Sequence, residues 1–315
     1  MTVDPASRPH GTELGRPGFP VYRHTDFDPV DLTSRKEGRT ISVCLPARDE
    51  AATIGTIVER IRLDLVERCP LVDELLVVDD SSTDDTAALA RAAGATVVPA
   101  GAILAEHGRN PGKGEALWKS LFVSRGDLVI WCDADIRNFD SRFVVGIVGP
   151  LLADPSLGFV KGFYRRPLRD DGEGGGRVTE LMARPLISAL FPHLGDLVQP
   201  LSGEFGGRRE LLEQVPFHQG YAVDLGLLVD LTARFGTAPV AQVDLGTRIH
   251  RNRPLRELGP QSAAILAMAL RHAAGEVDVP GELVLRRPEG DLTLGVGIRP
   301  PLIELSEYRQ RHEIG

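Results

Sequence analysis

The chain has 315 residues, of which 42% are hydrophobic, so it is long enough for one large or two ordinary domains with a sizeable buried core. Its formal net charge of -8 argues against sequence-independent binding of nucleic acid, which needs a basic surface. The three cysteines form no CxxC pair, which indicates reduced thiols in a cytoplasmic protein. We expect neither export nor a membrane span, because the most apolar later stretch, residues 262–270, is too short to cross a bilayer.

The first half of the chain alternates between short apolar runs and helical spacing. Residues 1–38, rich in proline, glycine and charge, predict an extended N-terminal arm. Strands are then predicted at 41–45, 75–80, 96–98 and 128–132. Helices are predicted at about 54–65, 83–93 and 115–124. This alternation predicts an open α/β fold with a mostly parallel sheet, in which ligands bind beyond the carboxyl ends of the strands.

The second half is less regular. It contains a glycine-rich loop at 170–177. Helices are predicted at 179–190, 226–236 and about 258–273, followed by a tail punctuated by proline and glycine.

Two acids directly follow the apolar run at 128–132. Asp133 and Asp135 are two residues apart, so in an extended chain their carboxylates point the same way and can converge. Hard oxygen ligands with open positions suit Mg²⁺ or Mn²⁺ shared with the phosphates of a substrate. The alternative is a solvated turn that caps the next element, a role that Asn138 and Asp140 would serve equally well.

A second acidic cluster follows the run at 75–80. Asp79 and Asp80 lie at the carboxyl end of the predicted strand, placed to accept hydrogen bonds from a ribose or a base. Residues 82–85 are explained by a hydroxyl N-cap followed by acids that complement the helix dipole.

Lys113 precedes the helix predicted at 115–124. The helix dipole disfavours a cation there unless an anion shares the site, and a nucleotide phosphate would remove the conflict. The alternative is a solvated lysine, since the stretch lacks the glycine spacing and final hydroxyl of a P-loop. The first strand turn, LPARDEAATI, also lacks the G-x-G-x-x-G of a dinucleotide site, which weighs against nicotinamide and flavin enzymes. In this turn Glu50 either caps the helix or reaches a base.

Basic and glycine-rich residues gather later in the chain. GGGRVTE at 174–180, together with Arg165 and Arg166, supplies backbone N–H and guanidinium groups that can bind a small anion. A flexible loop with surface charge is the alternative. His250 lies in the stretch TRIHRNRP, whose arginines favour a neutral imidazole that can complete a metal site with Asp133 and Asp135.

The following motifs occur in order from residue 45 to 255: LPARDE, VDDSSTDDT, PGKGEALW, DAD, FYRRPL, GGGRVTELMARPL, QPLSGE and HRNRPL. In this order they resemble the glucosyl- and mannosyl-3-phosphoglycerate synthases of glycosyltransferase family 81. The resemblance implies a GT-A fold, a nucleotide-sugar donor, Mg²⁺ or Mn²⁺, D-3-phosphoglycerate as acceptor, transfer with retention, and a homodimer. Together with the predicted elements, these motifs divide the chain into the arm (1–38), a donor-binding half (39–150), an acceptor-binding half (151–257) and a C-terminal helix and tail (258–315).

The resemblance also implies roles for matching positions. The donor would be bound by Pro46, Arg48, Glu50, Asp80, Lys113, Asp133 and Asn252. The metal would be held by Asp135 and His250. The acceptor would be bound by Arg166, Gly176, Arg177, Val178 and Thr179. Asp133, Asp224 and Arg177 would take part in catalysis, although Asp224 stands where many relatives carry glutamate.

From this resemblance we expect transfer of glucose, with UDP-glucose as the preferred donor. No side chain stands out as a nucleophile, so the acceptor hydroxyl is expected to attack from the face of the leaving group. The alternatives are mannose transfer from GDP-mannose and, in a different class, a non-catalytic nucleotide-binding protein. A nucleotidylyltransferase would need an early glycine- and arginine-rich loop, which the sequence does not provide. A polyprenyl-phosphate glycosyltransferase would need a membrane helix or an amphipathic docking face, and neither is evident in the sequence.

Overall fold

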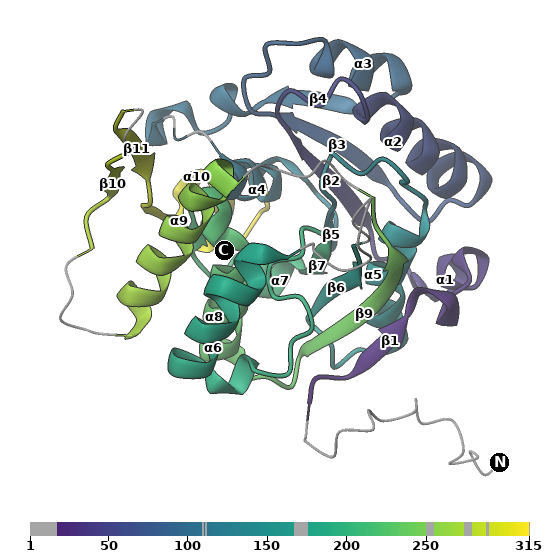
Figure 1. Ribbon diagram of the computed structural model, residues 1–315. Coiled ribbons are helices and arrows are strands. Elements are labelled where there is room, and N and C mark those ends of the chain that lie inside the picture. The colour runs from purple at the N-terminus through teal and green to yellow at the C-terminus, as the bar shows by residue number, and fades with distance from the viewer. Residues whose placement is uncertain are drawn as a thin grey trace.

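A central eight-stranded sheet organises the protein (Figure 1). The structure is a computed structural model that describes residues 18–108, 110, 112–166, 176–249, 255–273, 279–287 and 290–314. The sheet has the order β1-β9-β6-β7-β5-β2-β3-β4. Its strands are β1 (Val21–Arg23), β2 (Ile41–Ala47), β3 (Glu74–Asp79), β4 (Thr96–Pro99), β5 (Leu128–Trp131), β6 (Phe159–Arg165), β7 (Phe205–Arg208) and β9 (Val240–Thr247). Two small antiparallel sheets pair β8 (Phe217–His218) with β12 (Ile298–Arg299), and β10 (Glu282–Leu285) with β11 (Leu292–Gly295).

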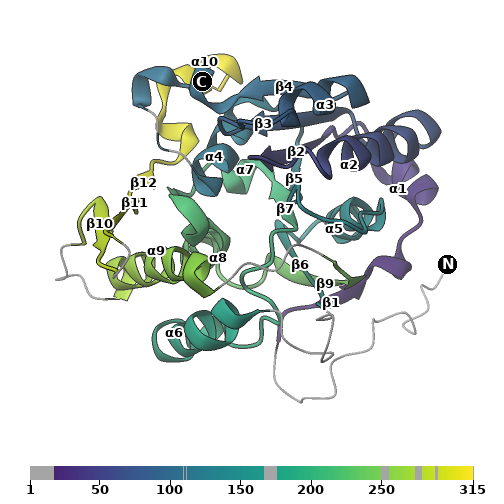
Figure 2. The same ribbon diagram turned by 45° about the horizontal axis from the view of Figure 1, so that its top comes forward.

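Helices cover both faces of the sheet (Figure 2). The α-helices are α1 (Pro29–Arg35), α2 (Ile54–Ile61), α3 (Thr86–Ala93), α4 (Lys113–Val123), α5 (Arg142–Ala153), α6 (Arg184–Leu190), α7 (Arg209–Leu212), α8 (Val223–Phe235), α9 (Leu255–Ala273) and α10 (Ser306–Arg311). π-Helical turns at Arg62–Arg68 and Thr179–Ala183 continue α2 and precede α6. Short 3-10 turns occur at His24–Asp26, Ala100–Ala102, Ala105–His107, Pro192–Leu194, Gly220–Ala222 and Leu302–Glu304.

The alternation of strand residues explains the two-sided core. In β2, Val43 and Leu45 pack in the cluster that contains α2 and α5, whereas Cys44 packs in the cluster that contains α4, α8 and α9. Successive side chains of a strand point to opposite faces, so a strand buried on both faces reads as a continuous apolar run.

Among the helices that the structure describes, none combines the length and the hydrophobicity that a membrane-spanning segment needs.

The predicted α/β architecture is confirmed, including the strands expected at 41–45, 75–80, 96–98 and 128–132. Strand β2 pairs in parallel with β3 and β5, and β3 pairs in parallel with β4. One strand, β7, runs antiparallel between β5 and β6. The carboxyl ends of β2, β3 and β5 therefore meet at one edge of the sheet.

Residues 21–35 do not form the extended arm that we predicted. Strand β1 pairs in parallel with β9, with Val21 opposite Gln242. Helix α1 follows its N-cap residue Asp28, whose side chain accepts hydrogen bonds from two backbone N–H groups, and the helix buries Leu32. A three-residue strand carries too little pattern to be recognised, and its partner lies far along the chain, so local sequence could not reveal the pairing.

The hydroxyl residues Ser82 and Thr83 do not cap α3 as predicted, because α3 begins only at Thr86 and its N-cap residue is Asp85. Instead, the backbone N–H of Asp49 donates to Ser82 Oγ at 3.0 Å, and the N–H of Thr83 donates to Asp49 Oδ1 at 2.7 Å. Asp84 accepts from the N–H groups of both Ala51 and Thr86. These bonds tie the loop after β2 to the loop after β3.

Candidate functional site

One cleft of about 470 Å³ gathers the predicted site residues at the carboxyl edge of β2, β3 and β5. All predicted site residues that the structure describes line it: Pro46, Arg48, Glu50, Asp80, Lys113, Asp133, Asp135, Arg166, Gly176, Arg177, Val178, Thr179 and Asp224. His250 and Asn252 lie outside the described residues. The sequence positions span both halves of the chain, so the fold brings the two predicted halves of the site together.

Charged side chains alternate along the cleft. Lys113 Nζ lies 2.9 Å from Asp133 Oδ1 and 2.9 Å from Asp224 Oδ1. Arg248 Nη2 donates to Asp133 Oδ2 at 3.0 Å and to Asp135 Oδ1 at 2.5 Å. The order is therefore Asp224, Lys113, Asp133, Arg248, Asp135, and each cation bridges two acids.

The ionisation of these groups follows from their pairing. Burial alone would raise the pKa of Asp133, but Lys113 and Arg248 outweigh it and hold that pKa below its usual range. Burial likewise opposes a charged Lys113, yet the carboxylates of Asp133 and Asp224 raise its pKa above the usual value. At neutral pH, Lys113 is protonated and Asp133 is ionised.

The position of Asp133 depends on a glycine in a neighbouring segment. A Cβ atom added at Gly203 would lie 1.9 Å from Asp133 Oδ2, which no packing allows. Gly203 belongs to the motif QPLSGE, so the close approach of this segment to the end of β5 explains why the motif contains glycine at that point.

Lys113 is the first residue of α4, close to its predicted place just before the helix. The unfavourable interaction with the helix dipole is offset here by the carboxylates of Asp133 and Asp224. Protein acids thus provide the anions that we had expected from a nucleotide phosphate. A bound phosphate would compete with them for the same ammonium group.

Asp80 directly follows β3 and contacts the loop that leads into α4. Its Oδ2 accepts a hydrogen bond from the N–H of Gly112 at 2.8 Å and lies 3.8 Å from Arg48 Nη1. Burial raises the pKa of Asp80, although both neighbours oppose the rise. Asp79, which we had grouped with Asp80, is not among the residues that line the cleft.

The predicted acceptor residues form one wall of the cleft. Gly176 has a φ of +93°, and Arg177 to Thr179 lead into the helical turn before α6. Arg166 Nη2 donates to Tyr164 Oη at 2.9 Å, and its guanidinium lies 4.9 Å from the centre of that ring. Of the two arginines in FYRRP, only Arg166 is among the residues lining the cleft. Residues 167–175, with most of the predicted glycine-rich loop, lie outside the described residues.

Sequence reasoning missed three buried charged groups at and beneath the cleft. Arg248, which we had considered only as a neighbour of His250, is 2% exposed and also contacts Glu204 at 3.5 Å. Glu204 is fully buried, and burial raises its pKa. Lys161 is 2% exposed within β6. A lysine inside the apolar run FVKGFY was the available signal, because an unpaired charge is rarely placed in a strand core.

Lys161 supports the segment that carries Asp224. Its Nζ donates to the carbonyl oxygen of Asp224 at 3.0 Å and lies 4.1 Å from the ring centre of Phe205. Burial is the main cause that lowers the pKa of Lys161 from 10.5 to about 7. Between these two pH values, the unfolded chain carries a proton that the folded chain lacks.

Lys161→Met is expected to remove this difference in bound protons. The wild-type free energy of unfolding should gain up to about 1.4 kcal/mol per pH unit from Lys161 as pH rises from 7 to 10, because stability rises wherever the unfolded state binds more protons. The variant should lack that contribution. Urea unfolding at pH 7, 8, 9 and 10 measures both profiles, and parallel profiles for the two proteins would contradict the assignment.

Known proteins resemble this chain over most of its length. The model of Glycosyl transferase family 2 matches residues 42–215. The glucosyl-3-phosphoglycerate synthase of Mycolicibacterium paratuberculosis is 52% identical over 262 residues, which cover 81% of this chain and 76% of that protein. The enzyme of the same name from Petrotoga mobilis is 40% identical over 309 residues, covering 92% of this chain and 95% of the relative.

Solved structures agree with the sequence comparison. A crystal structure of glucosyl-3-phosphoglycerate synthase from Mycobacterium tuberculosis with Mn²⁺, UDP-glucose and phosphoglyceric acid has a TM-score of 0.82 and 45% sequence identity. The match covers 90% of this chain and 98% of that one. Another structure of the same enzyme, with Mg²⁺ and UDP, has a TM-score of 0.81. With its GT-A fold and the cleft described above, the chain belongs to the glucosyl-3-phosphoglycerate synthase family of glycosyltransferases.

Proposed function

We propose that this protein transfers glucose from UDP-glucose to the 2-hydroxyl of D-3-phosphoglycerate with the help of a divalent metal ion. One observation carries the proposal: a single connected cleft is lined by both the predicted donor residues and the predicted acceptor residues. A relative at 45% identity binds Mn²⁺, UDP-glucose and phosphoglyceric acid together, which supports the same set of ligands here. A protein that only bound nucleotides would not need the acceptor wall, which is the part of the cleft lined by Arg166, Gly176, Arg177, Val178 and Thr179.

The donor half of the cleft suits a nucleoside diphosphate. In our proposal, Pro46, Arg48 and Glu50 surround the base and Asp80 accepts a hydrogen bond from the nucleoside. The ammonium group of Lys113, at the start of α4, then faces the diphosphate, where the helix dipole also favours an anion. Asn252 is proposed to follow toward the phosphates.

The proposed metal ligands suit a hard divalent cation. Asp135 offers carboxylate oxygens in the cleft, and its contact with the Arg248 guanidinium shows that this carboxylate binds a cation already. We propose that Asp135 and His250 hold Mg²⁺ or Mn²⁺ together with the donor phosphates. When bound, the ion would neutralise the diphosphate and stabilise the departing nucleotide.

The acceptor wall suits an anion of the size of phosphoglycerate. Arg166 and Arg177 supply guanidinium groups, which grip phosphate and carboxylate bidentately. Gly176, Val178 and Thr179 lie in or next to the first turn of a helical segment. The backbone N–H groups of a first helical turn can bind an anion. This concentration of cationic groups lets a chain with a net charge of -8 bind an acidic acceptor.

The ion pairs argue against a covalent sugar intermediate. Both oxygens of Asp133 contact cations, Oδ1 with Lys113 and Oδ2 with Arg248, and Asp224 is also paired with Lys113. A carboxylate held in this way is a weak nucleophile. We therefore propose that the acceptor 2-hydroxyl itself forms the bond to the anomeric carbon from the leaving-group face as the bond to the diphosphate oxygen breaks. The hydroxyl proton passes to that oxygen, and the configuration is retained.

The test is product formation, measured by mass spectrometry with purified protein, Mg²⁺ and 3-phosphoglycerate. UDP-glucose, GDP-glucose and GDP-mannose are offered separately, and glycerate replaces 3-phosphoglycerate as the acceptor control. We expect glucosyl-3-phosphoglycerate from UDP-glucose and no product from glycerate, because glycerate lacks the phosphate group that the arginines bind. Preferred turnover of GDP-mannose would favour the mannosyl alternative. Nucleotide binding without any product would overturn the proposed activity. The predicted homodimer is testable in parallel by sedimentation.

A further inference from the structure

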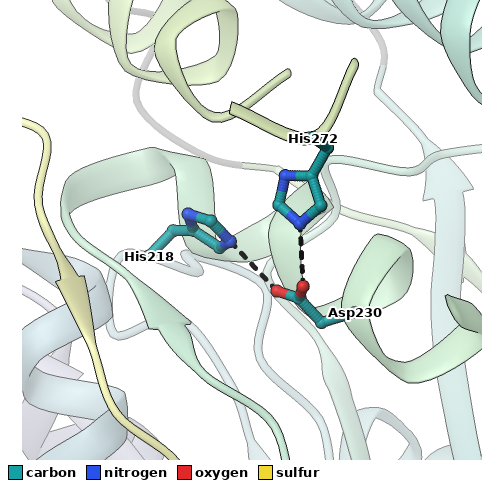
Figure 3. A group of neighbouring side chains, drawn as sticks. All are labelled: His218, Asp230 and His272. Atoms are coloured by element: carbon teal, nitrogen blue, oxygen red, sulfur yellow. Dashed lines mark hydrogen bonds and ion pairs between the residues drawn. The ribbon is translucent and has the colours of Figure 1, made fainter. Parts of the chain in front are cut away.

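Two histidines and an aspartate meet at one point outside the proposed substrate cleft (Figure 3). His218 ends β8, Asp230 lies in α8, and His272 lies in the last turn of α9. Nε2 of His218 is 3.0 Å from Asp230 Oδ2, and Nε2 of His272 is 2.8 Å from Asp230 Oδ1. Figure 3 shows both rings turned toward the same carboxylate. None of the three residues has a role in the proposed transfer.

The hydrogen bonds of His272 require a cation at this point. Its Nδ1 lies 2.9 Å from the carbonyl oxygen of Met268, which can only accept, and its Nε2 faces the carboxylate of Asp230. A neutral imidazole carries one N–H, so it can satisfy only one of these two acceptors. Either a second proton or a metal ion must stand between Nε2 and the carboxylate. The backbone carbonyl that fixes Nδ1–H is also the usual partner of a metal-binding histidine.

We propose that His218, Asp230 and His272 form a second metal site, which binds Zn²⁺ or a similar transition-metal ion through two imidazole nitrogens and one carboxylate. The candidate ligand atoms all lie within 4.8 Å of one another. Bonds of about 2.0 to 2.1 Å in a tetrahedral site place neighbouring ligand atoms roughly 3.3 Å apart, so the two nitrogen-to-oxygen separations of 3.0 and 2.8 Å need to widen by only a few tenths of an ångström to admit the ion. Two imidazole ligands favour zinc over magnesium, whereas the site proposed at Asp135 combines one imidazole with carboxylate and phosphate oxygens.

This group of three residues is partly accessible to solvent on one side. The side chain of His272 is 21% exposed, so a water molecule can reach the open position. On the buried side, a Cβ atom added at Gly226 would lie 2.3 Å from Cδ2 of His218, so glycine at this position of α8 allows the imidazole to approach the helix. The site therefore has one closed side and one side open to solvent.

A bound ion would join three elements, two of which, α8 and α9, reach the substrate cleft. Helix α8 carries Asp224 in its first turn, and α9 lines the cleft through Leu258, Gln261 and Ile265. The site lies farther along both helices, where it joins them to β8. We therefore expect zinc to stabilise the folded protein, since an ion that binds only the folded state shifts the unfolding equilibrium.

The experiment uses the full chain without an affinity tag, stripped with EDTA and kept in excess Mg²⁺ to occupy the Asp135 site. Elemental analysis after zinc addition and desalting should find one zinc ion per chain. Co²⁺ in its place should give the visible absorption bands of a tetrahedral cobalt site with nitrogen and oxygen ligands. Zinc should also raise the unfolding temperature. These three readouts need no variant, so they test the site even if a substitution prevents folding.

Variants then locate the ion. His272→Gln and Asp230→Asn should each weaken zinc binding by at least about 10-fold, since each removes one of three protein ligands. His193→Gln is the matched control, because His193 contacts α8 at Thr232 without facing Asp230, and it should retain the ion. Asp135→Ala should retain it as well. Wild-type protein that binds no zinc, or zinc lost only in Asp135→Ala, would overturn the proposal and leave a proton as the cation between His272 and Asp230.

Discussion

Asp135→Asn is expected to lower kcat/KM for UDP-glucose by about 1000-fold or more while leaving the protein folded. The amide is neutral and offers a weaker oxygen ligand, so the proposed metal would lose its carboxylate partner and the diphosphate would lose charge stabilisation. Initial rates at saturating Mg²⁺ measure the effect. Circular dichroism and the unfolding temperature show whether the fold persists. Because Asp135 lies on the cleft wall, only a modest loss of stability is expected.

Asp140→Asn is the matched control for this prediction. Asp140 follows the same strand, but its side chain is 49% exposed and it is not among the residues lining the cleft. Its turnover should remain close to that of the wild type. Near-normal activity of Asp135→Asn would refute the metal assignment. His250→Ala, which removes the second proposed ligand, should show the same loss as Asp135→Asn.

Lys113→Met is expected to reduce both activity and stability. Activity should fall by about 100- to 1000-fold, because the donor diphosphate loses the ammonium group at the start of α4. The free energy of unfolding should fall by about 3 to 5 kcal/mol, since the buried carboxylate of Asp224 loses its ammonium partner, although Asp133 keeps Arg248. Steady-state kinetics and urea unfolding measure the two effects separately.

Lys119→Met separates stability from activity in the same helix. Lys119 is also buried in α4 and pairs with Glu115 at 3.0 Å, but it is not among the residues that line the cleft. Arg299 also contacts Glu115, so the acid keeps a partner and the loss of stability should be smaller than in Lys113→Met. This variant should keep wild-type kcat/KM. An equal loss of activity in both variants would mean that Lys113 acts only through the fold.

Local sequence pattern was sufficient for the regular part of the fold. Buried strands such as β2 and β5 consist of continuous apolar runs, and α2 and α4 show helical spacing, so both kinds of element could be read without knowledge of their neighbours. The same reading placed Asp80 and Asp133 at the carboxyl ends of strands. Parallel strands bring these ends to one edge, and the structure confirms that both acids line one cleft.

Interactions between distant segments could not be read in this way. Arg248 contacts Asp133, Asp135 and Glu204, and nothing in the local pattern around any of them specifies these partners. The antiparallel β7 has only four residues, FGGR, and its two glycines carry no strand propensity. The resemblance to a known family supplied the acceptor residues, whereas composition and spacing alone left them as a flexible charged loop.

The parallel pairing of β1 with β9 has a consequence for folding during synthesis. Val21 leaves the ribosome early, yet its partner Gln242 is made only after most of the sheet. Until then, β1 lacks its partner strand, and unpaired strands favour aggregation. Completion of this edge must therefore be a late step in folding, and the long loop that it closes makes the step slow. Deleting β1 should leave a native-like product that exposes the edge of β9 and aggregates more readily than the full chain.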